Sequence, residues 1–121
     1  MSDSATEAVL YVCAERGTQT PALAEERALQ EGRAFAGERD LRLGEEITDH
    51  FGEVDPGKRP GWQRVRGMVA RGEVTTVIVR WPNAISTDQE LRYAEIAWCQ
   101  EHGVRVQFSW APLSELGGQG R

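Results

Sequence analysis

Two reactive side chains stand at the end of the first apolar segment of the chain. Residues 8–14 read Ala-Val-Leu-Tyr-Val-Cys-Ala, and Glu15 follows them directly. A thiol at the end of a buried strand could act as a nucleophile, and a nearby carboxylate could act as a general base. Neither His50 nor His102 stands at a spacing that would pair it with Cys13, and a loop carboxylate is ordinarily just solvated. The plainer interpretation of both Cys13 and Glu15 is therefore structural.

Two further positions could hold a ligand. Arg59 stands just before Pro60, which opens a predicted helix, and unpaired N–H groups at a helix N-terminus attract anions. Cys99 and His102 are one helical turn apart and could contribute to a metal site. Two ligands do not make a site, however, and a buried thiol with a cation at a helix C-terminus explains the pair equally well. We therefore predict neither a metal nor a cofactor.

The elements that must position these residues follow from the hydrophobic pattern. The nearly continuous apolar segment 8–14 is typical of a strand buried on both faces. Thr20-Pro21 provides an N-cap and a first helical residue, and Gly37 provides a stop. The pattern predicts helices at about 20–36, 60–70 and 87–102, and strands at 41–47 (broken at Gly44), 74–81 and 104–110, with an exposed loop at 48–58.

Strands and helices alternate, which predicts a mostly parallel sheet of four to five strands with helices on both faces, a three-layer α/β sandwich. We expect one domain at residues 8–110, with flexible tails at 1–7 and 111–121. The last strand, 104–110, should lie near an edge because its apolar residues alternate. Of the four tryptophans, Trp81 should be the most exposed and the most suited to contact a partner, whereas Trp62, Trp98 and Trp110 should be core or interface residues. In such sheets function lies at the carboxyl ends of the strands.

Several short segments carry a resemblance to a known family. In order along the chain they read Ile-Thr-Asp at 47–49, Arg-Pro-Gly-Trp at 59–62, Met-Val-Ala-Arg-Gly-Glu-Val at 68–74, and Glu-His-Gly-Val at 101–104. With this spacing, residues 8–110 resemble the N-terminal domain of serine recombinases, the resolvases, invertases and large phage integrases. The resemblance implies a resolvase-like fold. It also implies a site in which a serine attacks a DNA phosphate while arginines hold that phosphate.

The residues that the family needs for this chemistry are changed. Cys13 stands in place of an arginine and Glu15 in place of the nucleophile, and the family's Asp-Arg-x-x-Arg motif reads Asn-Ala-Ile-Ser-Thr at 83–87. The family's five groups (Arg, Ser, Asp, Arg, Arg) sum to a charge of +2, and their counterparts (Cys13, Glu15, Asn83, Ala84, Thr87) sum to −1. Four residues do match positions that line the family's site: Tyr11, Gln19, Asp49 and Arg59.

These changes predict that the domain is not an enzyme, since losing even one stabilising donor typically costs ~10²–10³ in rate. We expect instead a catalytically inactive, resolvase-like domain, linked to a mobile-DNA system, that acts as a protein-interaction or regulatory module. Its partner would be another protein or a second copy. The alternative is a small-ligand or anion binder that uses a cleft around Gln19, Asp49 and Arg59.

Composition and charge argue against several functional classes, among them DNA-binding, membrane and secreted proteins. The chain of 121 residues has a formal net charge of −5 and no long basic cluster, which argues against direct DNA binding. No apolar segment approaches the ~20 residues that span a bilayer, and the polar N-terminus does not resemble a signal peptide. Two distant cysteines without an export signal indicate free thiols in a reducing cytoplasm. One lysine against thirteen arginines indicates a GC-rich bacterial genome.

Overall fold

The computed structural model describes residues 7–14, 22–50 and 52–110. In this part of the chain four strands form one parallel sheet in the order β2-β1-β3-β4. The strands are β1 (Ala8–Ala14), β2 (Leu43–His50), β3 (Thr76–Val79) and β4 (Arg105–Phe108). The helices are α1 (Leu23–Glu38), α2 (Pro60–Ala70) and α3 (Gln89–Glu101), with two 3₁₀ turns, η1 (Pro56–Lys58) and η2 (Pro82–Ala84). The predicted α/β sandwich is confirmed.

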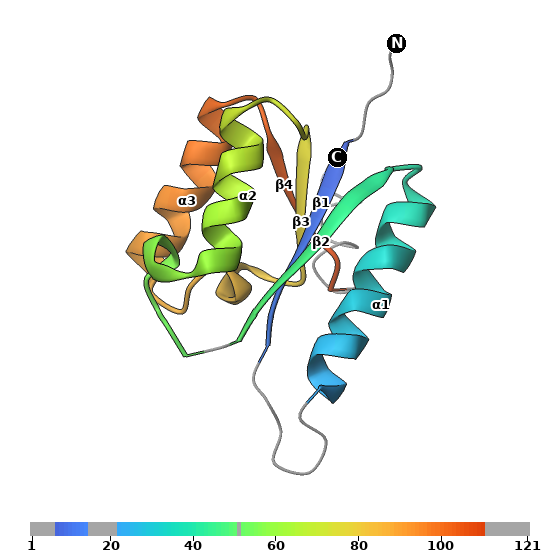
Figure 1. The fold of residues 1–121 in the computed structure, drawn as a ribbon, viewed down its shortest axis with the longest axis horizontal. Helices are drawn as coiled ribbons and strands as arrows, with labels where there is room; N and C mark the ends of the chain where they lie inside the picture. Colours follow the sequence, from blue (N-terminus) through green and yellow to red (C-terminus); the bar gives the residue numbers. More distant parts are fainter. Residues whose placement is uncertain (1–6, 15–21, 51, 111–121) are drawn as a thin grey trace, which may run out of the picture.

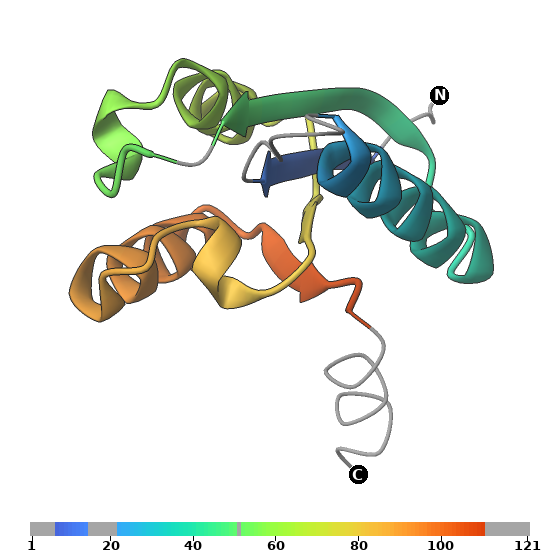
Figure 2. The ribbon, with the colours of Figure 1, turned by 90° about the horizontal axis from the view of Figure 1, so that it is seen from below.

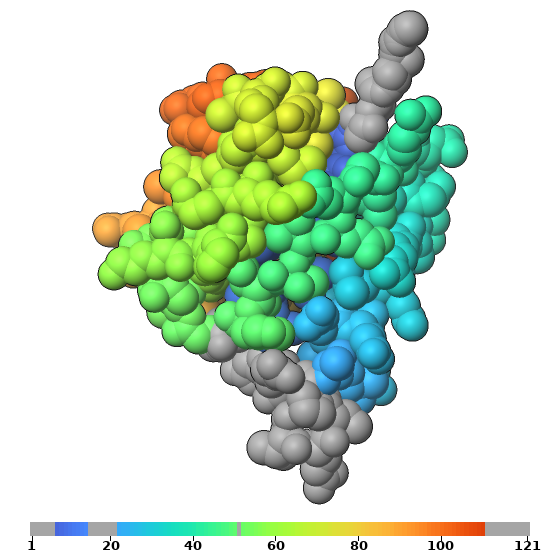
Figure 3. Space-filling model, in the orientation of Figure 1, coloured from blue at the N-terminus to red at the C-terminus, as the bar shows by residue number. Residues whose placement is uncertain are grey.

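Helices cover both faces of the sheet (Figures 1 and 2). The helix α1 lies on one face, and α2 and α3 lie together on the other. The central strand β1 serves both faces: Val9 and Tyr11 pack into the core under α2 and α3, and Leu10 and Val12 pack under α1. Side chains of α2, β2 and α1 together fill the face shown in Figure 3. No helix in the described ranges is long and apolar enough to cross a membrane.

The first helix begins and ends later in the chain than predicted, at Leu23 and Glu38. Its N-cap is Ala22, which makes no side-chain capping bond, and the expected cap Thr20-Pro21 lies outside the described residues. The predicted stop at Gly37 is wrong, because α1 continues to Glu38. The chain turns instead at Asp40, a residue with a φ of 56°. Aspartate tolerates this left-handed conformation better than most residues, so the turn does not need a glycine.

The exposed loop predicted at 48–58 is confirmed for residues 52–54, but its limits are wrong. Strand β2 extends to His50, because the residue pairs Val12–Thr48, Cys13–Asp49 and Ala14–His50 continue its ladder with β1. Pro56 is then buried in the turn η1, for which the Asp55 carboxylate accepts a bond from the Gly57 N–H. The break that we expected at Gly44 is a bulge within the strand, since the register with β1 shifts there.

The third helix is only partly buried. It begins at the N-cap Asp88, whose carboxylate accepts a hydrogen bond from Leu91 N, and Cys99 is its one fully buried residue. Ala94 and Ala97 are exposed. The helix covers β4, a four-residue edge strand, and so short an edge leaves part of the helix surface without sheet to pack on. The edge position predicted for the last strand is confirmed.

Candidate functional site

The carboxyl ends of the parallel strands meet at one edge of the sheet, where a connected group of buried polar side chains lies. Tyr11 in β1 donates a hydrogen bond to Asp49 Oδ2 in β2 at 2.7 Å. Arg59, at the start of α2, donates from Nη1 to the Tyr11 hydroxyl at 3.3 Å. The structure therefore brings together three of the four residues that match the family's site. The fourth, Gln19, lies outside the described residues.

Asp49 acts as the cap of α2. Its carboxylate accepts hydrogen bonds from Gly61 N at 2.9 Å and from Trp62 N at 3.0 Å. These are the N–H groups that would otherwise hold an external anion at the helix N-terminus. Burial, followed by the hydrogen bond to Asp49, raises the pKa of Tyr11 far above its usual value, so its phenol stays protonated. Asp49 is thus an internal anion that already satisfies this helix end.

Arg59 is almost wholly buried, with 2% of its surface exposed. Its Nε donates to the Glu53 carbonyl at 2.7 Å, and its Nη1 donates to the Ala84 and Ile85 carbonyls at 2.8 Å each. Its Nη2 is buried without a hydrogen-bond partner among the described residues. The guanidinium therefore ties the η2 segment to the start of α2, and most of its donors are occupied by backbone.

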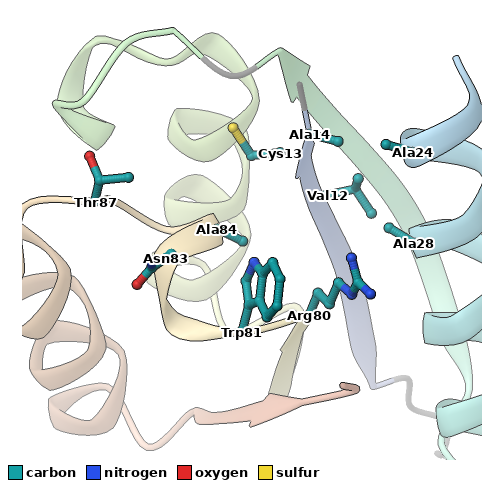
Figure 4. Close-up of a pocket in the computed structure, with 10 residues that line it drawn as sticks. All are labelled: Val12, Cys13, Ala14, Ala24, Ala28, Arg80, Trp81, Asn83, Ala84 and Thr87. Carbon is teal, nitrogen blue, oxygen red and sulfur yellow. The ribbon is translucent and has the colours of Figure 1, made fainter. Parts of the chain in front are cut away.

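A crevice opens beside this group, between the ends of β1 and β3 and the first turns of α1 (Figure 4). It has a volume of about 350 Å³. We call it the strand-end crevice. The residues that line it are Val12, Cys13, Ala14, Ala24, Ala28, Arg80, Trp81, Asn83, Ala84 and Thr87.

Four of the five changed family positions, Cys13, Asn83, Ala84 and Thr87, line the strand-end crevice. The fifth, Glu15, lies outside the described residues. The Cys13 thiol is half-buried, and this burial raises its pKa, which makes it a poor nucleophile near neutral pH. The Asn83 side chain accepts a hydrogen bond from Arg92 Nη1 at 2.8 Å, and Figure 4 shows it turned toward α3.

Two lining residues that sequence reasoning missed define the other side of the crevice. Arg80 lies with its guanidinium carbon 4.6 Å from the centre of the Trp81 ring, and its Nε is 3.1 Å from Glu31 Oε1 in α1. Ala28 is buried in α1 opposite. Arg80 directly follows the apolar strand β3, and this position in the sequence could have indicated that it lies at the site. The exposure predicted for Trp81 is confirmed, at 37% of its surface.

The remaining candidates, Cys99 and His102, lie at the C-terminal end of α3. Cys99 is fully buried, and burial raises the pKa of its thiol to about 11. His102 Nδ1 lies 2.9 Å from the Trp98 carbonyl. Within the described ranges no three His, Cys, Asp or Glu residues are grouped as a metal would require. Trp62 is buried as expected, and its indole donates to Glu95 Oε1 at 2.7 Å.

Comparison with known proteins shows which solved structures share this fold. No family model and no curated protein matches the sequence. Three solved structures illustrate the similarity in fold. The C-terminal catalytic domain of ISC1926 TnpA, an IS607-like serine recombinase, matches with a TM-score of 0.74 at 14% identity over 86% of this chain and 70% of that one. The N-terminal catalytic domain of TP901-1 integrase matches with a TM-score of 0.74 at 12% identity over 89% and 79%. A serine recombinase from Sulfolobus solfataricus matches with a TM-score of 0.60 at 19% identity over 84% and 68%.

These comparisons correct one expectation. We predicted from the changed residues that the domain is not an enzyme, but the solved domains that share its fold are catalytic domains of serine recombinases, which are enzymes. The expectation that the domain is not an enzyme is therefore not supported. The resemblance in fold, by contrast, is confirmed, and the chain has the α/β fold of the serine recombinase catalytic domain.

Proposed function

We propose that this domain works in the DNA-recombination system of a mobile element, and that it does so by binding a recombinase-type catalytic domain. The fold supports the first part, because the similar structures include two IS607-like serine recombinases, TP901-1 integrase and the first ORF in transposon ISC1904. Domains of one fold can serve different functions, so the site must support the second part.

The second part is supported by the partners of two guanidinium groups at this edge of the sheet, those of Arg59 and Arg80. Arg59 donates to three backbone carbonyls, and Arg80 is paired with Glu31. Among the described residues that line the strand-end crevice, Arg80 is the one cation. The net charge of −5 adds a general repulsion of DNA. A role through protein contact fits these charges better than the capture of a phosphodiester by this chain alone.

Exposed apolar side chains offer a surface for such contact. Tyr93 on α3 is 54% exposed, and Val54, in the segment before η1, is 42% exposed. The Ser86 hydroxyl donates to the Val54 carbonyl at 2.7 Å, which holds this segment against the start of α3. Aromatic side chains of this kind are enriched among residues that dominate binding.

A binding experiment tests the proposal. The chain would be mixed with the catalytic domain of a serine recombinase from the same genome and examined by gel filtration with light scattering. We expect a stable complex that is weakened by Tyr93→Ala and unaffected by the control Arg105→Gln, a change of an exposed residue on β4. Two separate monomers would contradict the proposal.

A further inference from the structure

We propose that the strand-end crevice binds a small aromatic carboxylate, with the ring against Trp81 and the carboxylate on Arg80. This site differs from the anion site that the sequence suggested around Asp49 and Arg59, because both of those side chains are hydrogen-bonded to groups of the protein itself. It is also separate from the association proposed above, whose contact surface is on α3.

The size and lining of the crevice indicate a compact, largely apolar ligand. Its volume of about 350 Å³ lies at the lower end of the ~300–1,000 Å³ range of small-molecule sites, which are lined mainly by apolar side chains. Val12 and Ala14 at the end of β1 form one wall, and Ala24 and Ala28 of α1 form the facing wall. The two α1 residues have single-methyl side chains, and Figure 4 shows them set back from the centre of the crevice.

Trp81 supplies a rigid aromatic wall. Its ring centre is 5.0 Å from that of Trp110, with 69° between the ring planes, an edge-to-face contact that fixes the indole. The side chain nevertheless remains 37% exposed. A planar ring that covers this surface would meet an indole that is already ordered, and ring–ring contacts add attraction beyond the area buried, so an aromatic ligand is favoured over an aliphatic one.

Arg80 supplies the charge. Its Nε is buried and has no hydrogen-bond partner among the described residues, although the Glu31 carboxylate lies 3.1 Å away as an ion pair. The side chain is 40% exposed, and no acidic residue is among those described as lining the crevice. A guanidinium presents its N–H groups in a planar fork that fits a carboxylate with two hydrogen bonds. The bound carboxylate would compete with Glu31 for this fork.

Titration of the ¹⁵N-labelled protein with indole-3-carboxylate, followed by NMR at the Trp81 indole N–H, tests the proposal. Indole-3-carboxamide is the matched neutral probe. We expect saturable shifts with the carboxylate and at least about tenfold weaker binding of the carboxamide, since a hydrogen bond to a charged group is lost. Arg80→Gln should weaken carboxylate binding by a similar factor, whereas Arg105→Gln should leave it unchanged.

Two further variants separate binding from simple structural damage. Ala24 is exposed, so Ala24→Leu should fill the crevice and abolish binding while the protein stays folded, and Ala97→Leu on exposed α3 is its control. Glu31→Gln should strengthen binding by about two- to fivefold, because it removes the competing carboxylate. The proposal is overturned if the carboxamide binds as tightly as the carboxylate, if Ala24→Leu binds normally, or if no saturable shift occurs up to about 10 mM.

Discussion

Removing the Asp49 carboxylate should destabilise the domain more than removing any exposed carboxylate. Asp49 accepts two N–H groups of α2, from Gly61 and Trp62, and the Tyr11 hydroxyl. Loss of a helix cap costs about 0.5–2 kcal/mol, loss of the charge at the helix N-terminus about 0.3–1, and loss of the hydroxyl bond about 0.5–1.5. These terms overlap, so we expect Asp49→Ala to lower the free energy of unfolding by about 1–4 kcal/mol, out of the 5–15 that is typical of a domain.

Urea unfolding, followed by circular dichroism, measures this difference. The matched control is Asp55→Ala, because Asp55 caps only the short exposed turn η1 with one bond to Gly57 N. Its cost should stay below about 1 kcal/mol. Tyr11→Phe should cost about 1 kcal/mol alone and less in the Asp49→Ala background, since the shared hydrogen bond is already gone. A cost for Asp49→Ala no larger than that of the control would refute the assignment of Asp49 as the internal anion of α2.

Three other changes test the packing and the ionisation states. Gly32→Ala should be neutral or destabilise the fold by up to about 2 kcal/mol, because its Cβ would lie 2.4 Å from a leucine methyl of β1. Gly37→Ala in the same helix has open space around it and should stabilise the fold by up to about 1 kcal/mol. Thermal unfolding measures both changes, and stability changes of the same sign for the two variants would contradict this prediction. With its pKa raised to about 11, Cys99 is only about one part in a thousand thiolate at pH 8, so alkylation followed by mass spectrometry should find it unlabelled until the protein is unfolded. Hydrogen bonds from Arg33 lower the folded-state pKa of the Glu46 carboxyl. The stabilisation from this pair is therefore present above the unfolded pKa and is lost as the pH falls through the lowered folded-state pKa. Glu46→Gln should cost less than about 1 kcal/mol at pH 7 and nothing at a pH below the folded-state pKa, as urea unfolding at pH 7 and at that lower pH would show.

Local pattern was enough to predict the elements and their arrangement. The apolar segment 8–14 is β1 with the predicted limits, and Pro60 opens α2 as expected from its fixed φ. Errors occur where an element ends, because ends depend on partners distant in sequence. Strand β2 runs on to His50 because β1 offers it a ladder, and no residue within 48–50 could have shown that.

The site was predictable as a location but not as a set of interactions. The sequence correctly placed Cys13 and Asn83 near one another, since Cys13 lies at the carboxyl end of β1 and Asn83 follows β3 in a parallel sheet. It could not show that Arg59 would be buried, because its acceptors are carbonyls of residues 84 and 85, some 25 positions away. Carbonyl positions leave no trace in residue identity. A charged residue beside a helix start therefore suggested an exposed anion site where the fold makes an internal brace.

The strand order has a consequence for synthesis on the ribosome. Strand β1 is made first but lies between β2 and β3, and the second of these neighbours is complete only about 65 residues after β1 ends. At roughly 5–20 residues per second, this strand waits about 3–13 s for both its flanks. During that interval a strongly apolar heptamer with at least one open edge is a target for chaperones and for other nascent chains. Expression yield at different temperatures should therefore depend more on β1 than on any other strand of the sheet.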